Sequence, residues 1–246
     1  MTRSYIEVGG DDRVAFLQGI LTQDVSRLAE QKIQFAALLS PQGKILHDMF
    51  LIDQGQHILI DTASAYKEVL LKRLTMYKLR AKVTLAEGNA PSTILPDPRH
   101  VQLPPLGAGN LAERVELGIP EFGIDIAPDS MTAMDAGYDL LNAISFTKGC
   151  YVGQEVTARM HYKSIARKGF FIISAIDPLT PGASITTADR AIGTLSSVFE
   201  NNALAFLKFD DAVAGDARVD GRPVKLTVPG WMEPKLALFE NGSKNQ

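Results

Sequence analysis

Hydrophobic and polar positions divide the N-terminal third of the chain into strand-length and helix-length segments. Apolar side chains recur at helical spacing in residues 14–21, behind Asp12 as an N-cap, and in residues 66–77, behind Thr62 or Ser64 as the cap. The strand-length apolar runs, two of them joined by a hairpin turn at 41–44, are residues 5–8, 34–39, 45–53, 57–61 and 82–86. This order predicts an antiparallel sheet with helices packed on one face, which is an α+β layer architecture.

The segment of residues 88–109 is rich in proline. It contains five prolines, so this stretch is a poor helix and a poor central strand, and we interpret it as a linker. Residues 111–117 predict a short helix that ends at Gly118 as its C-cap. Residues 130–142 predict a second helix, which leads into the stretch around the single cysteine.

The C-terminal third consists of short apolar runs separated by turn residues, a spacing typical of a small antiparallel barrel or sandwich. The predicted strands are residues 169–175, 192–197, 203–209 and 224–228, and residues 242–246 are expected to be a frayed tail.

A chain of 246 residues is long enough for two or three compact units. We expect three domains. These are an N-terminal α+β sheet domain at 1–88, a linker and middle domain at 89–165, and a C-terminal β-barrel domain at 166–246.

The strongest candidate for a reactive site is the stretch of residues 148–159, which holds the only cysteine of the chain, Cys150, between two glycines. A cysteine reacts as the thiolate, which is favoured beside a cation or at the start of a helix. Lys148 lies two residues before Cys150, and Gly153 permits a tight turn into a helix on which Glu155 and Arg159 are spaced to pair. We therefore expect a partly exposed, reactive thiol; the alternative is a small buried hydrophobe.

Charge points to the same region. The stretch 148–168 carries five cations (Lys148, Arg159, Lys163, Arg167 and Lys168) and one acid, Glu155, in a chain of net charge -3. Such a basic patch favours an anionic ligand near the cysteine, although it is equally compatible with a solvated surface. The slightly acidic chain as a whole disfavours direct nucleic-acid binding.

Several classes of protein are disfavoured by what the sequence lacks. One cysteine allows no intrachain disulfide, and four histidines without paired spacing give no zinc pattern. The first ten residues contain neither an apolar signal core nor an arginine-rich leader, and no apolar run is long enough to span a bilayer. We therefore expect a cytoplasmic protein of bacterial type without a membrane association.

The run Lys-Gly-Cys-Tyr-Val-Gly-Gln-Glu at 148–155, followed by Ala158-Arg159, closely resembles the signature of the YgfZ-type folate-binding proteins, which are relatives of the glycine cleavage system aminomethyltransferase. Similarity extends through segments at 16–25, 41–44, 97–99 and 118–121. The resemblance implies a ferredoxin-like antiparallel sheet with helices, a middle α+β segment and a small barrel, arranged around a central folate channel. It also implies a protein that binds tetrahydrofolate and supports the assembly or repair of iron-sulfur enzymes, including those that modify tRNA.

The resemblance and the residues together nominate a site. Cys150 is the reactive group, with Lys148 beside it, and a single cysteine cannot hold a stable cluster, which usually takes four thiolates. We therefore expect no stable metal, and partners that are iron-sulfur enzymes or cluster-assembly proteins. The nominated folate contacts are Arg114, Tyr151, Gly153, Gln154, Glu155, Arg159 and Arg99, with Phe16, Phe122 and Tyr151 as candidates for stacking the pterin.

Two alternatives stay open at this point. One is a folate-dependent aminomethyl or other one-carbon transferase, for which the nearest acid in the helix at 64–74 is Glu68. The other is a hydrolase that pairs Cys150 with His161, although proximity in sequence is weak support for such a pair. The chain also departs from the family pattern in two places, at 131–135 and after Arg159, where a basic residue and a glycine are expected and Tyr162-Lys163-Ser164 stands.

Overall fold

The computed structural model of the protein describes residues 2–92, 95–99, 111–163, 166–188, 190–213 and 215–243. The chain forms two compact units, and it passes between them several times. Unit 1 comprises Met1–Gly107, Pro128–Ala133 and Tyr138–Ala158, and unit 2 comprises Ala108–Ala127, Met134–Gly137 and Arg159–Gln246. The division into three domains expected from the sequence stays a prediction.

Unit 1 is built on one five-stranded antiparallel sheet with the order β2-β3-β4-β1-β5. Strands β2, β3 and β4 are buried on both faces, which explains why they appear in the sequence as nearly continuous apolar runs. The strands are β1 (Arg3–Gly9), β2 (Ile33–Leu39), β3 (Ile45–Asp53), β4 (Ile58–Ala63) and β5 (Thr84–Gly88). The expected hairpin is confirmed, because β2 and β3 pair from Ile33 opposite Ile52 to Leu39 opposite Ile45.

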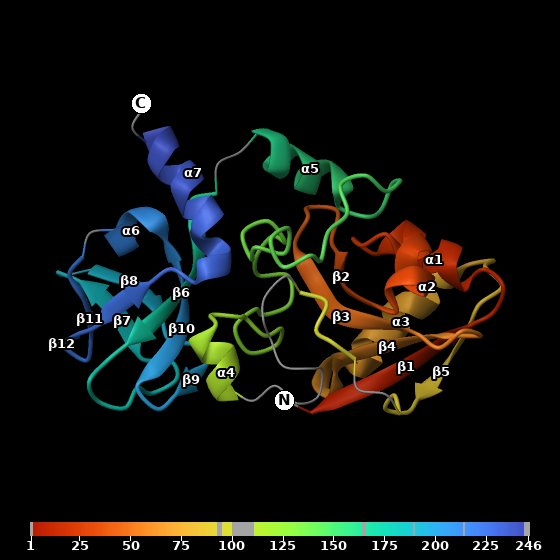
Figure 1. The fold of residues 1–246 in the computed structure, drawn as a ribbon, viewed down its shortest axis with the longest axis horizontal. Coiled ribbons are helices and arrows are strands. Elements are labelled where there is room, and N and C mark those ends of the chain that lie inside the picture. Colours follow the sequence, from red (N-terminus) through yellow and green to blue (C-terminus); the bar gives the residue numbers. More distant parts are fainter. Residues whose placement is uncertain are drawn as a thin grey trace. The chain divides into compact units, whose positions relative to one another are not determined.

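Helices of unit 1 pack against the sheet, as Figure 1 shows. They are α1 (Arg13–Ile20), α2 (Leu28–Gln31) and α3 (Lys67–Lys78). Leu17 of α1 and Leu70 and Leu74 of α3 share a core with Ile6 and Ile60 of the sheet. The expected caps are wrong in detail. At α1 the Asp12 carboxylate does not cap the helix and instead accepts the Lys82 backbone N–H at 2.8 Å. At α3 the N-cap position is occupied by Tyr66, which makes no side-chain cap hydrogen bond.

The helix expected at 130–142 is not formed. This segment consists of turns, with positive φ angles at Asp129 (57°) and Asn142 (56°). Its backbone pairs with the start of β3: Asp129 N–H donates to Ile45 O at 2.8 Å, and Ile45 N–H donates to Met131 O at 3.0 Å. The Met131 carbonyl, which a helix would use within itself, is therefore taken by strand β3, and tertiary pairing overrides local propensity.

Unit 2 contains two four-stranded antiparallel sheets, β13-β6-β10-β9 and β12-β11-β7-β8. They share one core that includes Phe171, Ile185, Leu207 and Val219, as expected for the predicted C-terminal barrel. Strands β7, β9, β11 and β12 were not predicted. The strands are β6 (Lys168–Ser174), β7 (Ser184–Thr187), β8 (Arg190–Thr194), β9 (Val198–Phe199), β10 (Asn202–Lys208), β11 (Ala217–Val219), β12 (Arg222–Pro223) and β13 (Lys225–Thr227).

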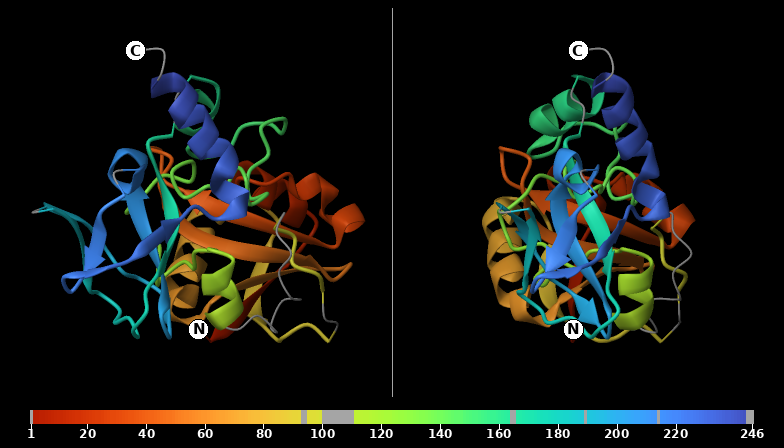
Figure 2. Two further views of the ribbon diagram at one scale, coloured as in Figure 1. Left: turned by 60° about the vertical axis from the view of Figure 1, so that its left-hand side comes forward. Right: turned by 90° about the vertical axis from the view of Figure 1, so that its left-hand side faces the viewer.

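Short helices complete unit 2, and Figure 2 shows its last helix running beside the strands. They are α4 (Leu111–Glu116), α6 (Phe209–Val213) and α7 (Glu233–Ser243). Gly118 follows α4 with φ 71°, which confirms its predicted C-cap role. The frayed tail expected at 242–246 is corrected in part: α7 continues to residue 243, and residues 244–246 lie outside the described residues. Phe239 supports α7 by packing on Phe209, with ring centroids 5.4 Å apart.

Candidate functional site

The turn before helix α5 (Gln154–Lys163) depends on Gly153, as the sequence predicts. Gly153 has φ 83°, and a Cβ atom there would lie 2.5 Å from the carbonyl oxygen of Ser40. The motif backbone therefore lies directly on the β2–β3 hairpin turn, at a distance that only glycine permits. Thr157 secures the first turn of the helix by donating its hydroxyl to Gly153 O at 2.9 Å.

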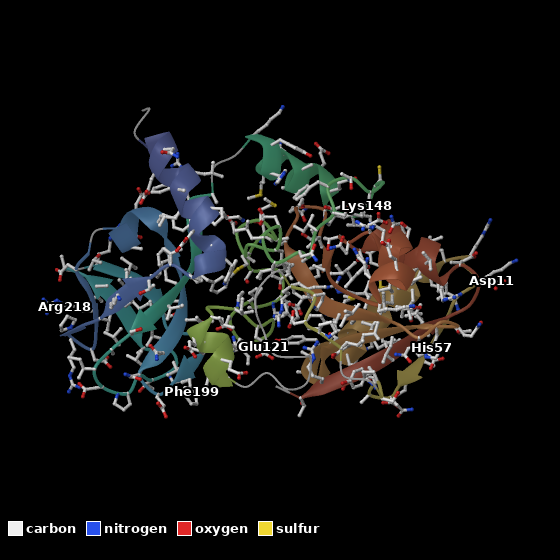
Figure 3. The ribbon with its side chains drawn as sticks, in the orientation of Figure 1. Asp11, His57, Glu121, Lys148, Phe199 and Arg218 are labelled. Atoms are coloured by element: carbon white, nitrogen blue, oxygen red, sulfur yellow. The ribbon has the colours of Figure 1, made fainter. Side chains whose placement is uncertain are left out.

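Lys148 anchors the other end of the loop (Figure 3). Its side chain is buried, and Nζ donates to the carbonyl oxygens of Gln18 at 2.7 Å, Leu21 at 2.6 Å and Gln23 at 2.8 Å. Helix α1 ends at Ile20, so the ammonium satisfies carbonyls that have no partner within the helix and complements the negative end of its dipole. Burial lowers the pKa of Lys148 to about 8, and nearby Asp24 opposes this shift.

Cys150 lies between these two anchors and is exposed. A thiol on a loop fixed at both ends is available to a partner without rearrangement of the fold. All three hydrogens of the Lys148 ammonium are directed at backbone carbonyls, which gives the lysine an anchoring role. Its expected effect on the reactivity of Cys150 stays a prediction.

Tyr151 turns inward from the same loop. Its ring lies 5.2 Å from Lys148 Nζ, an arrangement suited to a cation–π interaction, and its side chain is buried. Burial raises the pKa of Tyr151 to about 12, while a hydrogen bond with Thr157 opposes the rise. Phe16 and Phe122, the other stacking candidates, are also buried core residues.

The polar residues of α5 face solvent to different degrees. Gln154 is half-buried, and Glu155 and Arg159 are exposed. Among the described ion pairs there is none between Glu155 and Arg159, although their spacing permits one.

Arg99 interacts with an acid and two aromatic rings of unit 1. Its Nε and Nη2 atoms donate to the two carboxylate oxygens of Asp97 at 2.9 and 2.6 Å. Its guanidinium carbon lies 5.5 Å from the ring centroid of Phe35 and 5.2 Å from that of Phe50. The charge of Arg99 is therefore already paired and stacked.

Arg114 forms the centre of a polar cluster in unit 2. Its Nη1 atom donates to Asp125 Oδ2 at 2.6 Å and to Ile119 O at 2.9 Å, and Nη2 donates to Ser197 Oγ at 2.5 Å. Its Nε atom lies 3.3 Å from a carboxylate oxygen of Glu121. The Asp125 side chain is fully buried and also accepts hydrogen bonds from Ser196, Ser197 and the Glu121 backbone. This cluster ties α4 and the segment after it to the strands of unit 2.

The structure thus brings together some of the nominated residues. Lys148, Tyr151 and Gly153 lie in the same loop as Cys150 and hold it in place. The residues of the two alternatives are both exposed: Glu68 lies in the first turn of α3, and His161 lies near the end of α5. The Lys148 acceptors and Asp125 were missed, because a backbone carbonyl has no sequence signal and an acid eleven residues from an arginine has no fixed spacing.

The chain is similar to known proteins both in sequence and in fold. A family model described as the CAF17 C-terminal beta-barrel domain matches residues 167–234. The human protein "Iron-sulfur cluster assembly factor IBA57, mitochondrial" is 27% identical over 296 residues, covering 93% of this chain and 83% of the relative. The mouse protein of the same name is 26% identical over 298 residues with the same coverage. The chain is similar to IBA57 proteins over most of its length, and its C-terminal part matches the CAF17 barrel-domain model.

The fold comparison agrees. The glycine cleavage system aminomethyltransferase T of Bartonella henselae has a TM-score of 0.71 and 15% identity, covering 92% of this chain and 82% of that chain. The YgfZ resemblance and the α+β fold class with a C-terminal barrel domain are therefore confirmed.

The expected cytoplasmic location is contradicted. The IBA57 relatives of human, mouse and Mycosarcoma maydis are all named as mitochondrial rather than cytoplasmic. That expectation relied on the lack of a leader in the sequence, and such a lack does not determine the compartment.

The nominated cations fit tetrahydrofolate only in part. The folate carboxylates need free cations, but Arg99 and Arg114 already bind Asp97 and Asp125. Arg159 is the exposed cation of the nominated set. Within the described ranges, no group of three or more His, Cys, Asp and Glu side chains is arranged to hold a metal ion, and no helix is long and apolar enough to cross a membrane.

Proposed function

We propose that this IBA57/CAF17 relative is an accessory factor for the assembly or repair of iron-sulfur enzymes, and that Cys150 is its reactive group. The observation that carries the proposal is the exposed thiol on a loop anchored by Lys148 and Gly153. The names of relatives that match 93% of the chain support the iron-sulfur role.

The chemistry of one thiol limits what it does. A thiolate is a soft ligand for iron, but a cluster usually takes four such ligands. Cys150 therefore acts together with ligands of a partner, which is an iron-sulfur enzyme or a cluster-assembly protein. Enzymes that modify tRNA are among the clients on this proposal.

Tetrahydrofolate is the proposed cofactor, and its binding is the finer part of the proposal. Gln154, Glu155 and Arg159 offer polar groups on α5, and Arg159 supplies a cation for a folate carboxylate. Arg99 and Arg114 support the surrounding fold through their carboxylate pairs.

The decisive experiment compares Cys150→Ser with the wild-type protein in a host that lacks the endogenous gene. The serine keeps the approximate size but loses the soft ligand and nucleophile. We expect iron-sulfur enzyme activity to fall, most under oxidative stress, while the purified variant keeps its fold and its folate affinity. Normal iron-sulfur enzyme activity in the Cys150→Ser host would refute the role of the thiol.

Glu68→Gln provides the matched test of the one-carbon transferase alternative. Glu68 lies at the start of α3, in a fold shared with an aminomethyltransferase, but it is exposed to solvent. If it were a general acid or base, its loss would lower turnover by about 10²–10⁴-fold. We expect Glu68→Gln to retain the activity of the iron-sulfur enzymes in the same host.

Folate binding is tested separately by titration calorimetry with tetrahydrofolate. Arg159→Met should weaken binding, and Lys208→Met, which removes an exposed cation of β10, serves as the control. An absence of heat at millimolar tetrahydrofolate would refute the cofactor proposal, because an affinity weaker than about 1 mM corresponds to less than about 4 kcal/mol.

A further inference from the structure

Helix α3 presents a second surface, which the proposed function does not use. We define the α3 face as the exposed residues Val69, Lys72, Met76, Leu79 and Arg80. Val69, Lys72 and Met76 are three and four residues apart and lie along one stripe of α3, and Leu79 and Arg80 follow directly after the helix. The other side of the helix packs into the core through Leu70 and Leu74. Figure 2 shows α3, drawn in amber, at the outside of unit 1.

The apolar members of the α3 face are unusually exposed. Met76 is 75% exposed, Leu79 is 87% exposed and Val69 is 47% exposed. Single exposed apolar side chains are common on soluble proteins, but Met76 and Leu79 lie three residues apart at the end of α3 and expose two large apolar side chains next to several cations.

The backbone of Leu79 adds an independent observation. Leu79 follows α3 with φ 44° and ψ -108°, in a region that disfavours a branched side chain. Glycine adopts such a positive φ angle without steric cost, because it lacks a Cβ atom. The fold therefore holds a large apolar side chain in a strained conformation and largely exposed to water, where it contributes little to the core. Strain of this kind is concentrated at functional sites.

The charge around the α3 face is strongly positive. Residues 67–82 contain six cations and one acid, Glu68, in a chain of net charge -3. Lys67 pairs with Glu87. Among the described residues the other five have no ion-pair partner: Lys72, Arg73, Lys78, Arg80 and Lys82. An acidic surface is the electrostatic complement of such a cluster.

We propose that the α3 face is a docking site for an acidic protein segment that carries apolar anchor residues. The partner's carboxylates pair with Lys72 and Arg80, and its apolar side chains cover Met76 and Leu79. The proposal does not depend on Cys150 or on folate.

The composition of the face favours a protein over other anionic partners. A phosphate backbone is held by cations and polar groups, and exposed Met76 and Leu79 add nothing to such contacts. A helix that lies in a membrane interface presents a continuous apolar side, whereas Lys72 and Thr75 separate Val69 from Met76 here.

The test uses the full chain and a synthetic helical peptide of glutamates with two leucines one helical turn apart. Fluorescence anisotropy measures binding, and amide chemical shifts locate it. We expect the peptide to shift the amides of residues 67–82, and to bind at least about tenfold more tightly than the same peptide with serines in place of the leucines.

Variants assign the binding to the α3 face. We expect two double variants each to weaken the binding of the peptide by about tenfold or more. One combines Met76→Ser with Leu79→Gly, and the other combines Lys72→Glu with Arg80→Glu. Ile176→Ser combined with Lys225→Glu is the matched control, because it removes an exposed apolar residue and a cation from unit 2 and should leave binding unchanged. Circular dichroism verifies that each variant is folded.

Several outcomes would overturn the proposal. One is equal binding of the leucine and serine peptides, and another is no binding of either at millimolar concentration. Tighter binding of an RNA oligonucleotide, or of phosphatidylserine vesicles, through the same residues would assign the face to another class of partner. Concentration-dependent dimerisation that the Met76→Ser, Leu79→Gly variant abolishes would assign it to a second copy of the chain. Cys150→Ser should leave peptide binding unchanged, so this test and that of the proposed function fail independently.

Discussion

At the residue scale, the two glycines around Cys150 have different roles. Gly153 has a positive φ angle and lies against the Ser40 carbonyl, whereas a Cβ atom at Gly149 would meet no atom within 4 Å. The sequence presents both as turn glycines, and only the neighbouring hairpin distinguishes them. Lys148 shows the same principle, because its role is set by three carbonyls that come from another part of the chain.

Gly153→Ala is predicted to destabilise the protein by about 1–3 kcal/mol, since it combines backbone strain with a clash against backbone atoms. It should also displace the loop that carries Cys150. Gly149→Ala is the control and should change the free energy of unfolding by less than about 0.5 kcal/mol. Denaturant titration of both variants measures the difference, and equal stabilities would contradict the close approach at Gly153.

His47 predicts a pH dependence of stability. Burial lowers the pKa of His47 to about 4 from 6.5, and the nearby Arg73 adds to the shift. Between these values the unfolded chain binds a proton that the folded chain does not, so the free energy of unfolding decreases as the pH falls from 6.5 to 4. The loss from this group is about 3 kcal/mol. In His47→Gln, the free energy of unfolding should depend less on pH between 6.5 and 4 when it is measured by denaturation. An unchanged pH dependence would contradict the prediction.

At the element scale, polar cross-links hold short elements that have few apolar contacts of their own. Helix α4 has a single buried residue, Val115, and its position is secured by Arg114 through Asp125, Glu121 and Ser197. The end of α3 is a different feature, where an exposed leucine with a positive φ angle stands at a position that glycine usually occupies. Both features follow from contacts or exposure that local propensity does not contain.

Arg114→Met is predicted to destabilise unit 2 by about 3 kcal/mol, because it leaves the fully buried Asp125 carboxylate without its cation. Adding Asp125→Asn should recover part of the loss, since the unpaired charge is removed. Arg159→Met, at an exposed cation, is the control. A loss of folate affinity without a loss of stability in Arg114→Met would instead favour the ligand-binding role predicted from the family resemblance.

At the scale of the whole molecule, the chain does not complete one unit before starting the next. Residues 108–127 belong to the same compact unit as the C-terminal strands, although the strands begin some forty residues later in the chain. The Trp231 indole N–H donates to Leu117 O at 3.1 Å, and Asp125 accepts hydrogen bonds from Ser196 and Ser197. The proposed C-terminal domain at 166–246 therefore lacks part of its own packing.

A fragment of residues 166–246 is predicted to be poorly folded alone and to gain structure when a peptide of residues 111–127 is added. The peptide supplies Arg114 and Asp125, so Asp125→Asn in the peptide should weaken the complementation. Amide dispersion in NMR spectra measures the effect. A fully folded fragment without the peptide would support 166–246 as an independent domain.

The sequence by itself determined the sheet of unit 1, its hairpin, the helices α1 and α3, the turn at Gly153 and the family resemblance. These features depend on local periodicity, on turn chemistry or on a contiguous motif, all of which are visible along the chain. Tertiary structure alone decided that residues 130–142 form turns, that Lys148 binds the end of α1, and that Arg114 pairs with Asp125. In each case the deciding groups are backbone carbonyls or a distant carboxylate, and their positions follow from how the chain folds back on itself rather than from any spacing in the sequence.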